Sequence, residues 1–222
     1  GLNLTNIREL SLCLPPLSEQ TKITQILFTW DLAIEVAEKL LQNCKLQKIA
    51  LMQQLLSGKK RMHNFSGKWS VVPLKSVLIE EKSRNKDKSV QRVLSVTNHS
   101  GFILPEEQFS KRVASIDVSN YKVIKKGQFA YNPSRINVGS FARLDDHDVG
   151  IVSPMYVVFG VKNNVLSSNY FLTWMSSNEA KQRVLSSTQG TVRDSVSFDA
   201  LCGFPFKLPP IDEQNKINEV IL

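Results

Sequence analysis

The chain has 222 residues, 42% of them hydrophobic, which is enough for one well-packed domain with a further element attached. It carries 28 Lys and Arg against 20 Asp and Glu, and this formal net charge of +8 favours a polyanionic partner. The three cysteines are widely spaced without a C-x-x-C pair, which excludes a disulfide framework. No apolar run reaches the roughly 18 residues of a membrane helix, which excludes a membrane span. Together these features predict a cytoplasmic protein with no membrane partner.

An internal repeat lies near the two ends of the chain. Residues 14–20 read LPPLSEQ and residues 208–214 read LPPIDEQ, and the similarity continues over the next seven residues. The two prolines favour an extended approach to a helix, for which we expect Ser18 and Asp212 to be the N-caps. The repeat predicts the end of one globular unit at 1–17, a connector helix at 18–57, a second unit at 58–208 and the start of another connector at 209–222.

The first connector is predicted to be a long coiled-coil helix. Residues 18–57 contain no Pro or Gly, and apolar residues recur at alternating steps of four and three, interrupted only by Lys48. About 40 residues at ~1.5 Å each give a rod on the order of 60 Å, longer than a typical core helix. We expect the helix to end at Ser57-Gly58. The positions predicted to pair with another helix are Ile23, Leu27, Trp30, Ile34, Leu41, Leu51 and Leu55.

An apolar seam of this length needs a partner. The partner is expected to be the equivalent helix of the second repeat or the same helix of a second copy, so the chain is predicted to self-associate. Further apolar residues widen the stripe beyond a two-helix seam and leave surface for another subunit. These residues include Leu32, Val36, Leu40, Leu46 and Ile49.

Beyond His63 the pattern changes to short β-branched and aromatic runs separated by turns. Strands are predicted at 69–74, 90–96, 113–116, 121–124, 128–131, 139–143, 150–153 and 156–161, and helices at 168–185 and 197–201. The fold class predicted for the chain is therefore α+β, with one globular mixed domain joined to a long coiled-coil helix.

Sequence signals for catalysis are weak. The three histidines, His63, His99 and His147, are far apart, and there is no Gly-rich phosphate loop or G-x-S-x-G motif. Tyr131-Asn132-Pro133 resembles part of an amino-methyltransferase loop, but the second proline and the aromatic residue are missing. We therefore predict no catalytic residue, no metal site and no cofactor.

The basic excess lies in the middle of the chain. Residues 58–200 hold 21 Lys and Arg against 12 Asp and Glu, whereas the rest holds 7 against 8. This segment also contains polar loops with Arg, Asn and Gln, which read base edges, and Lys, which attracts phosphates; each loop alone could also be an ordinary solvated turn. The predicted DNA-binding residues are Arg84, Lys86, Lys88, Asn98, His99, Lys125, Lys126, Asn132, Arg135, Asn137, Gln189, Thr191 and Arg193.

Four stretches of the sequence resemble the specificity subunit of type I restriction-modification enzymes. They are LPPLSEQTKI, the helix end LQKIALMQQLLSGKKRM, the following WSVVPL, and LPPIDEQNKI. The resemblance implies a recognition domain that reads one half of a split double-stranded DNA site. It also implies helices that space two such domains and dock methyltransferase subunits and, through them, the restriction subunit. A complete member has two domains and two helices, so we expect a piece of one or a half-subunit that dimerises.

Two other functions were weighed, of which only the first remains open. In the first, the chain is an assembly protein whose helix recruits partners and whose domain binds protein instead of DNA. The second, an enzyme acting alone as a methyltransferase or nuclease, lacks the motifs that it would need.

Overall fold

The computed structural model describes residues 3, 7–9, 11, 13–98, 100–104, 117–188 and 195–221. The chain divides into two compact units, Gly1–Ala50 and Leu51–Leu222. The second unit includes the last turns of the long helix and the segment after residue 208, because both pack into its core. As functional divisions, the segments 1–17, 18–57, 58–208 and 209–222 stay predictions.

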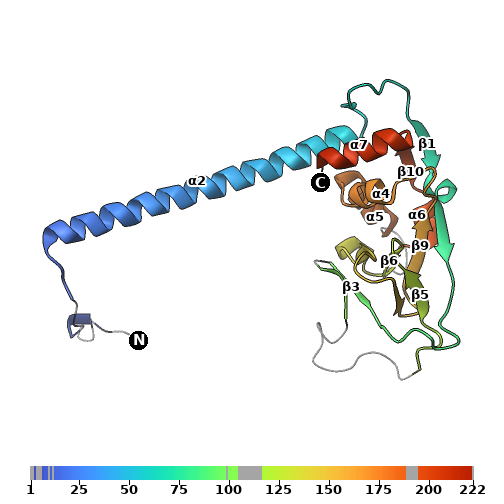
Figure 1. Cartoon of the computed structure of the whole chain (residues 1–222), viewed down its shortest axis with the longest axis horizontal. Coiled ribbons are helices and arrows are strands. Elements are labelled where there is room, and N and C mark those ends of the chain that lie inside the picture. The colour runs from blue at the N-terminus through green and yellow to red at the C-terminus, as the bar shows by residue number, and fades with distance from the viewer. Residues whose placement is uncertain are drawn as a thin grey trace. The chain divides into compact units, whose positions relative to one another are not determined.

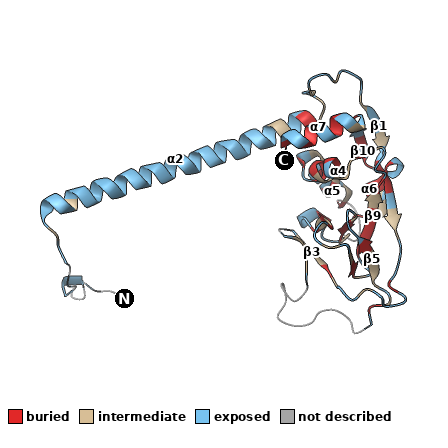
Figure 2. Cartoon of the chain, viewed as in Figure 1, coloured by how far each residue is buried: buried red, intermediate tan, exposed pale blue. Residues whose placement is uncertain are grey.

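The predicted long helix is α2, Leu17–Leu56, which runs without interruption (Figure 1). Every residue from Thr21 to Ala50 is exposed (Figure 2). The helix ends where expected, since Gly58 has a left-handed φ of +73° and a Cβ there would lie 3.2 Å from the Trp69 ring. Glycine is the residue that fits both constraints.

The predicted N-caps are wrong. α2 begins at Leu17 and α7 (Ile211–Ile221) begins at Ile211, so Ser18 and Asp212 lie inside the first turns. In α2, the backbone N–H groups of Glu19 and Gln20 donate to the Pro16 carbonyl at 2.9 and 3.0 Å. The ring of the proline before each helix fixes a φ compatible with a helix start, and proline has no backbone N–H that would need a hydrogen-bond partner.

The globular unit is built from small antiparallel sheets, as far as the structure describes it. A four-stranded sheet has the order β2 (Leu78–Glu81), β9 (Val157–Val161), β6 (Phe129–Tyr131) and β7 (Phe141–Arg143). The two-stranded sheets are β1 (Ser70–Pro73) with β10 (Pro205–Leu208), β3 (Ser95–Thr97) with β4 (Gly101–Ile103), and β5 (Lys122–Lys125) with β8 (Val149–Val152). The helices are α4 (Ser168–Met175), α5 (Asn178–Thr188), α6 (Phe198–Cys202) and α7, with 3-10 turns η1 (Leu74–Ser76) and η2 (Ile136–Val138). α4 packs against both α5 and α7 (Figure 1).

Aromatic residues from the sheet and from α4 form the centre of the core. Phe129 lies 5.5 Å from Phe141, 5.4 Å from Phe159 and 5.3 Å from Phe171, measured between ring centroids. The same hydrophobic cluster contains Leu55 and Leu56 of α2 and Ile217 and Ile221 of α7. A second cluster fills the space around β5 and β8; its fully buried members are Ile124, Leu144, Val152 and Val158, with Ala130.

The predicted α+β class is confirmed, and most strands lie within two residues of their predicted positions. The single helix expected at 168–185 is two helices, because Ser176 donates back to the Thr173 carbonyl and Ser177 accepts from the Ala180 N–H to start α5. Of the strand expected at 90–96, only the last two residues form a strand, which is β3 and also includes Thr97. The strands β2, β4 and β10 were not predicted. The strand expected at 113–116 lies outside the described residues.

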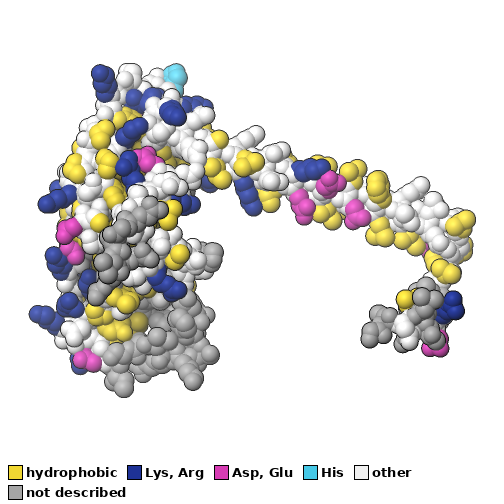
Figure 3. All heavy atoms as spheres, turned by 180° about the vertical axis from the view of Figure 1, so that it is seen from behind, with side chains coloured by type: hydrophobic (Ala, Val, Ile, Leu, Met, Phe, Trp, Pro, Cys, Tyr) yellow, Lys and Arg dark blue, Asp and Glu magenta, His cyan; other side chains and the backbone are white. Residues whose placement is uncertain are grey.

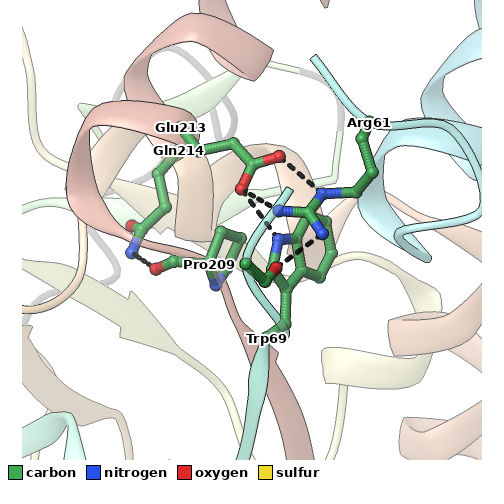
Figure 4. A network of polar contacts seen from close by, with 6 residues as sticks. Arg61, Trp69, Pro209, Glu213 and Gln214 are labelled. Carbon is green, nitrogen blue, oxygen red and sulfur yellow. Dashed lines mark hydrogen bonds and ion pairs between the residues drawn. The ribbon is translucent and has the colours of Figure 1, made fainter. Parts of the chain in front are cut away.

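A polar network fixes α7 to the globular unit (Figure 4). The fully buried Glu213 accepts hydrogen bonds from Arg61 Nε at 2.8 Å, Arg61 Nη2 at 2.7 Å and Trp69 Nε1 at 2.8 Å. Gln214 donates to the carbonyls of Val165 and Pro209. Charged and amide groups on one face of α7 therefore hold the end of the repeat against its own domain.

Candidate nucleic-acid interface

A polar cleft of about 210 Å³ lies beside the loop that joins β6 to β7. Three predicted DNA-binding residues line it: Asn98 from the loop between β3 and β4, and Asn132 and Arg135 from the β6–β7 loop. The remaining lining residues are Ser95, Val96, Thr97, Val138, Ser140 and Tyr156. The fold thus brings together two loops that are more than 30 residues apart in the sequence.

The β6–β7 loop is held by its own backbone. The Asn132 N–H donates to the Ser140 carbonyl at 3.1 Å, and the Ser140 N–H donates to the Arg135 carbonyl at 3.0 Å. The Asn132 side chain accepts from the Ser134 N–H at 3.1 Å, which makes an Asx turn. These bonds leave the Arg135 side chain exposed on a preformed turn.

Gly139 sets the close approach of the two loops. Its φ of +97° is left-handed, and a Cβ there would lie 3.1 Å from Asn98 Cβ. The buried Ser140 hydroxyl joins the same loops by donating to the Val96 carbonyl at 3.3 Å. The position of Asn98 in the cleft therefore depends on a glycine in the opposite loop.

A larger groove of about 640 Å³ adjoins the cleft and shares Asn98 and Val138 with it. Asn137, another predicted DNA-binding residue, lines this groove. Its walls are mainly apolar residues of η2, α4 and α5, among them Ile136, Leu172 and Val184. The amides of Asn98 and Asn137 together with the apolar lining make this groove suited to both hydrogen bonding and van der Waals contact.

Tyr156 belongs to the cleft although sequence reasoning did not select it. Its hydroxyl oxygen accepts from the Val96 N–H at 3.4 Å and lies 3.5 Å from Ser95 Oγ. A tyrosine at the start of an apolar strand carries no sequence signal that separates a cleft residue from a core residue. Its contacts with Ser95 and Val96 place it in the cleft.

The basic loop between β2 and β3 is tied to neighbouring segments. Arg84 donates to the Asn120 carbonyl at 2.8 Å, and Lys88 pairs with Asp117 at 3.2 Å. The buried Asn85 both donates to and accepts from the backbone of Val90. Lys86 is exposed in this loop. The loop therefore presents its cations from a fixed backbone.

Lys125 ends β5 and Lys126 begins the turn that follows it; both are exposed, and neither lines the cleft or the groove. Lys122, on the same strand, donates to the Tyr156 carbonyl at 2.6 Å, and burial lowers its pKa from the ordinary value. On the face shown in Figure 3, Lys and Arg side chains are spread along the globular unit instead of gathering in one patch.

Four predicted site residues, His99, Gln189, Thr191 and Arg193, lie outside the described residues. Within the described ranges, no group of three or more His, Cys, Asp or Glu side chains is arranged to hold a metal ion. Over the same part of the chain, no helix is long and apolar enough to cross a membrane.

No family model matches the sequence. Solved structures do match the fold. The crystal structure of the HsdS subunit from Thermoanaerobacter tengcongensis aligns with a TM-score of 0.56 and 16% identity over 94% of this chain and 50% of that one. The type I restriction-modification S subunit from M. genitalium aligns with a TM-score of 0.58 and 11% identity over 99% of this chain and 57% of that one.

A third match is a chain from a structure solved to explain complex assembly and conformational transition of the type I restriction-modification system. It has a TM-score of 0.52 and 15% identity over 94% of this chain and 52% of that one. The chain spans about half the length of these structures. The long helix and the mixed globular unit together thus have the fold of type I restriction-modification specificity subunits, as the sequence motifs predicted.

Proposed function

We propose that this chain is a non-catalytic DNA-specificity module, whose globular unit reads one half of a bipartite DNA site and whose long helix positions that unit within a type I restriction-modification assembly. The observation that carries the proposal is the polar cleft, in which Asn98, Asn132 and Arg135 converge from two loops. The fold of the solved S subunits supports the same role.

The chemistry of the cleft suits base reading. A guanidinium pairs with guanine O6 and N7, and a carboxamide pairs with adenine N6 and N7 in the major groove. Arg135 stands exposed on a turn whose backbone is held by hydrogen bonds, so the backbone of this residue is in place before DNA binds. The cations Arg84, Lys86 and Lys88, with Lys125 and Lys126, supply phosphate attraction that does not depend on sequence. They add affinity, and the cleft adds specificity.

The experiment measures binding to a pool of DNA duplexes with a randomised core, from which a preferred sequence is selected. Arg135→Ala should weaken binding to the selected duplex by about 1 to 3 kcal/mol and weaken binding to random duplex much less. The matched control is Arg183→Ala, because Arg183 pairs with Glu179 within α5 and does not line the cleft. Equal losses on both duplexes would reduce Arg135 to a backbone contact.

We also propose that α2 docks methyltransferase subunits, and the restriction subunit through them. Its exposed apolar side chains occupy more than one face (Figure 3). The predicted seam contains Ile23, Leu27, Trp30, Ile34 and Leu41, and a second group contains Phe28, Leu32, Val36, Leu46 and Ile49; all are between 44% and 68% exposed. A helix of a water-soluble assembly covers such faces with other helices.

A spacer role for α2 has its own test. Inserting four residues, about one helical turn, near Glu38 should lengthen the gap between half-sites that the assembled enzyme accepts, without changing the bases read in either half. Methylation of duplexes with graded spacers measures this. An unchanged spacer preference would contradict the role.

A second candidate function is that of an assembly protein that binds other proteins and no DNA. The exposed helix favours it, because the helix presents apolar surface regardless of what the globular unit binds. The salt dependence of duplex binding separates the two. A DNA reader that neutralises several phosphates loses affinity steeply as salt rises. A chain that binds partner subunits but no duplex at low salt is an assembly protein.

A further inference from the structure

Val138 is an exposed apolar residue of the candidate interface that the sequence did not single out. Its side chain is 59% exposed, and it lines both the polar cleft and the adjoining groove. Asn98 is the other residue that the two hollows share. The predicted DNA-binding residues were all polar or charged, so an aliphatic side chain was not among them. Val138 lies where the hydrogen-bonding cleft meets the apolar groove.

The turn η2 holds Val138 at this place. The Val138 N–H donates to the Arg135 carbonyl at 3.2 Å, and the Gly139 N–H donates to the Ile136 carbonyl at 3.1 Å. Ile136 is 6% exposed and belongs to the main hydrophobic cluster, so it anchors the turn that presents Val138 to solvent. A valine has a single side-chain torsion, and its branched Cβ restricts that torsion. The position of the Val138 side chain is therefore set by the fold within narrow limits.

The apolar surface continues from Val138 into the groove. Leu185 is 41% exposed there, and Phe141 and Leu172 are half-buried in the same lining. A single exposed apolar side chain is ordinary on a protein surface, but a continuous strip of them marks a contact surface. Val71 of β1 is an example of the ordinary kind, since it is 66% exposed and lines neither hollow.

Two hydrogen-bonding side chains that share the cleft with Val138 are free to meet a base. Within the described residues, the Asn98 carboxamide and the Arg135 guanidinium make no hydrogen bond or ion pair. Asn132 differs, because its oxygen accepts from a backbone N–H two residues on and its nitrogen donates to Met155 Sδ at 3.8 Å. The free groups and the valine together match a base-pair edge that carries both polar atoms and an apolar group.

The C5-methyl group of thymine is such an apolar group. In the major groove, thymine presents this methyl group beside its O4 acceptor, and the paired adenine presents N7 and N6, which a carboxamide can bind. Uracil has the same hydrogen-bonding groups as thymine and lacks the methyl group. A side chain that reads thymine by apolar contact therefore distinguishes the two bases, whereas one that reads it by hydrogen bonds alone does not.

We propose that Val138 is a specificity-determining residue, whose methyl groups pack against the C5-methyl group of a thymine in the half-site. This inference rests on the proposed reading of DNA by the cleft and adds the identity of one base to it. The groove is continuous with the cleft through Asn98 and Val138, so a thymine at their boundary lies next to the bases that Asn98 and Arg135 read. A protein segment in the groove would give no preference for thymine over uracil.

The test replaces thymine by uracil, one position at a time, in the duplex selected from the randomised pool. In the parent chain, one replacement should weaken binding about fourfold, the factor expected for one buried methyl group. Val138→Ser lacks both γ-methyl groups and should bind the thymine and uracil duplexes equally. Val138→Thr carries the same hydroxyl but keeps one γ-methyl group, so it should retain a preference of about twofold or more. Fluorescence anisotropy titrations measure the four affinities and the parent pair.

The control for position is Val71→Ser, which makes the same change at the exposed valine outside both hollows and should keep the fourfold ratio. The control for folding is the thermal midpoint. Because Val138 is exposed, Val138→Ser should shift the midpoint by less than about 4 °C. If the serine variant does not fold, Val138→Ala takes its place, since alanine also lacks both γ-methyl groups.

The outcomes separate this inference from the proposed function. A selected duplex without thymine, or a uracil series without a sensitive position, overturns the role of Val138 and leaves DNA reading intact. The role is also overturned by a serine variant that keeps the full thymine preference, including one that loses affinity equally for both duplexes. A chain that selects no duplex overturns the proposed function and the role of Val138 with it.

Discussion

The exposed length of α2 and the globular unit use apolar residues in opposite ways. Leu41 and Leu55 occupy equivalent seam positions of one helix, yet Leu41 is 56% exposed and Leu55 is 1% exposed. Leu55 lies in a cluster that also contains Ile217 and Ile221 of α7 and residues of α4. The heptad pattern therefore encodes an apolar surface, and its residues are buried only where other elements pack against that surface.

The largest effect on this contrast is expected from Glu213→Ala. It leaves Arg61 without its carboxylate in a partly buried site and should destabilise the globular unit by on the order of 3–5 kcal/mol. Glu19→Ala, at the equivalent exposed position, should change the unfolding free energy by less than about 0.5 kcal/mol. Urea unfolding followed by tryptophan fluorescence measures both. Similar values for the two variants would remove the contrast.

The same glutamate predicts an acid-dependent loss of stability. Burial by itself would raise the pKa of Glu213, but the hydrogen bonds from Arg61 and Trp69 lower the pKa below its ordinary value of 4.5. A carboxyl group with a lowered folded-state pKa adds stability above its unfolded pKa and loses that stability as the pH falls through the folded value. The stability difference between the parent chain and Glu213→Gln should therefore shrink below about pH 4.5. A difference independent of pH would show that Glu213 is not charged when folded.

Leu55→Ala should cost about 2–4 kcal/mol, because it removes a fully buried side chain and leaves a cavity. Leu41→Ala makes the same chemical change in the same helix and should cost less than about 0.5 kcal/mol. Chemical unfolding at a protein concentration at which the chain is monomeric gives both values. A large cost for Leu41→Ala under those conditions would mean that the seam is already covered.

Leu41→Glu tests the seam as an interface. A charge in an apolar helix pair should raise the dissociation constant for self-association at least tenfold, or about 1.4 kcal/mol. Gln42→Glu adds the same charge one residue further on, away from the seam, and serves as the control. Sedimentation equilibrium measures the constants. A chain that stays monomeric at micromolar concentration, with Leu41→Glu behaving identically, would contradict self-association.

The smallest effect concerns charge. Lys86→Ala should weaken binding to all duplexes by less than about 1 kcal/mol and reduce the slope of log affinity against log salt by about one. Lys45→Ala, on the exposed length of α2, should change neither the affinity nor the slope. Filter binding over a salt series separates them. An equal change for both lysines would mean that the basic excess of residues 58–200 does not mark the DNA surface.

Local and periodic features were determined by the sequence alone. The absence of Pro and Gly with a sustained heptad predicted α2, Gly58 predicted its end, and alternating apolar runs predicted most strands, because each of these depends on residues close in the chain. The repeated block and the motifs around it predicted the fold that the solved S subunits share. The break between α4 and α5 was missed, since two serines that bond to their own backbone stop a helix without Pro or Gly.

Which polar residues share a site could be seen only in the folded chain. Asn98, Asn132 and Arg135 meet in one cleft with Tyr156, while Lys125 and Lys126 do not line it, because strand pairing and the left-handed Gly139 bring distant loops together. The fold also decided that Glu213 is buried and Glu19 is exposed, although their sequence contexts are nearly the same. Hydrophobic and charged groups are encoded residue by residue, but their burial depends on what the rest of the chain places against them.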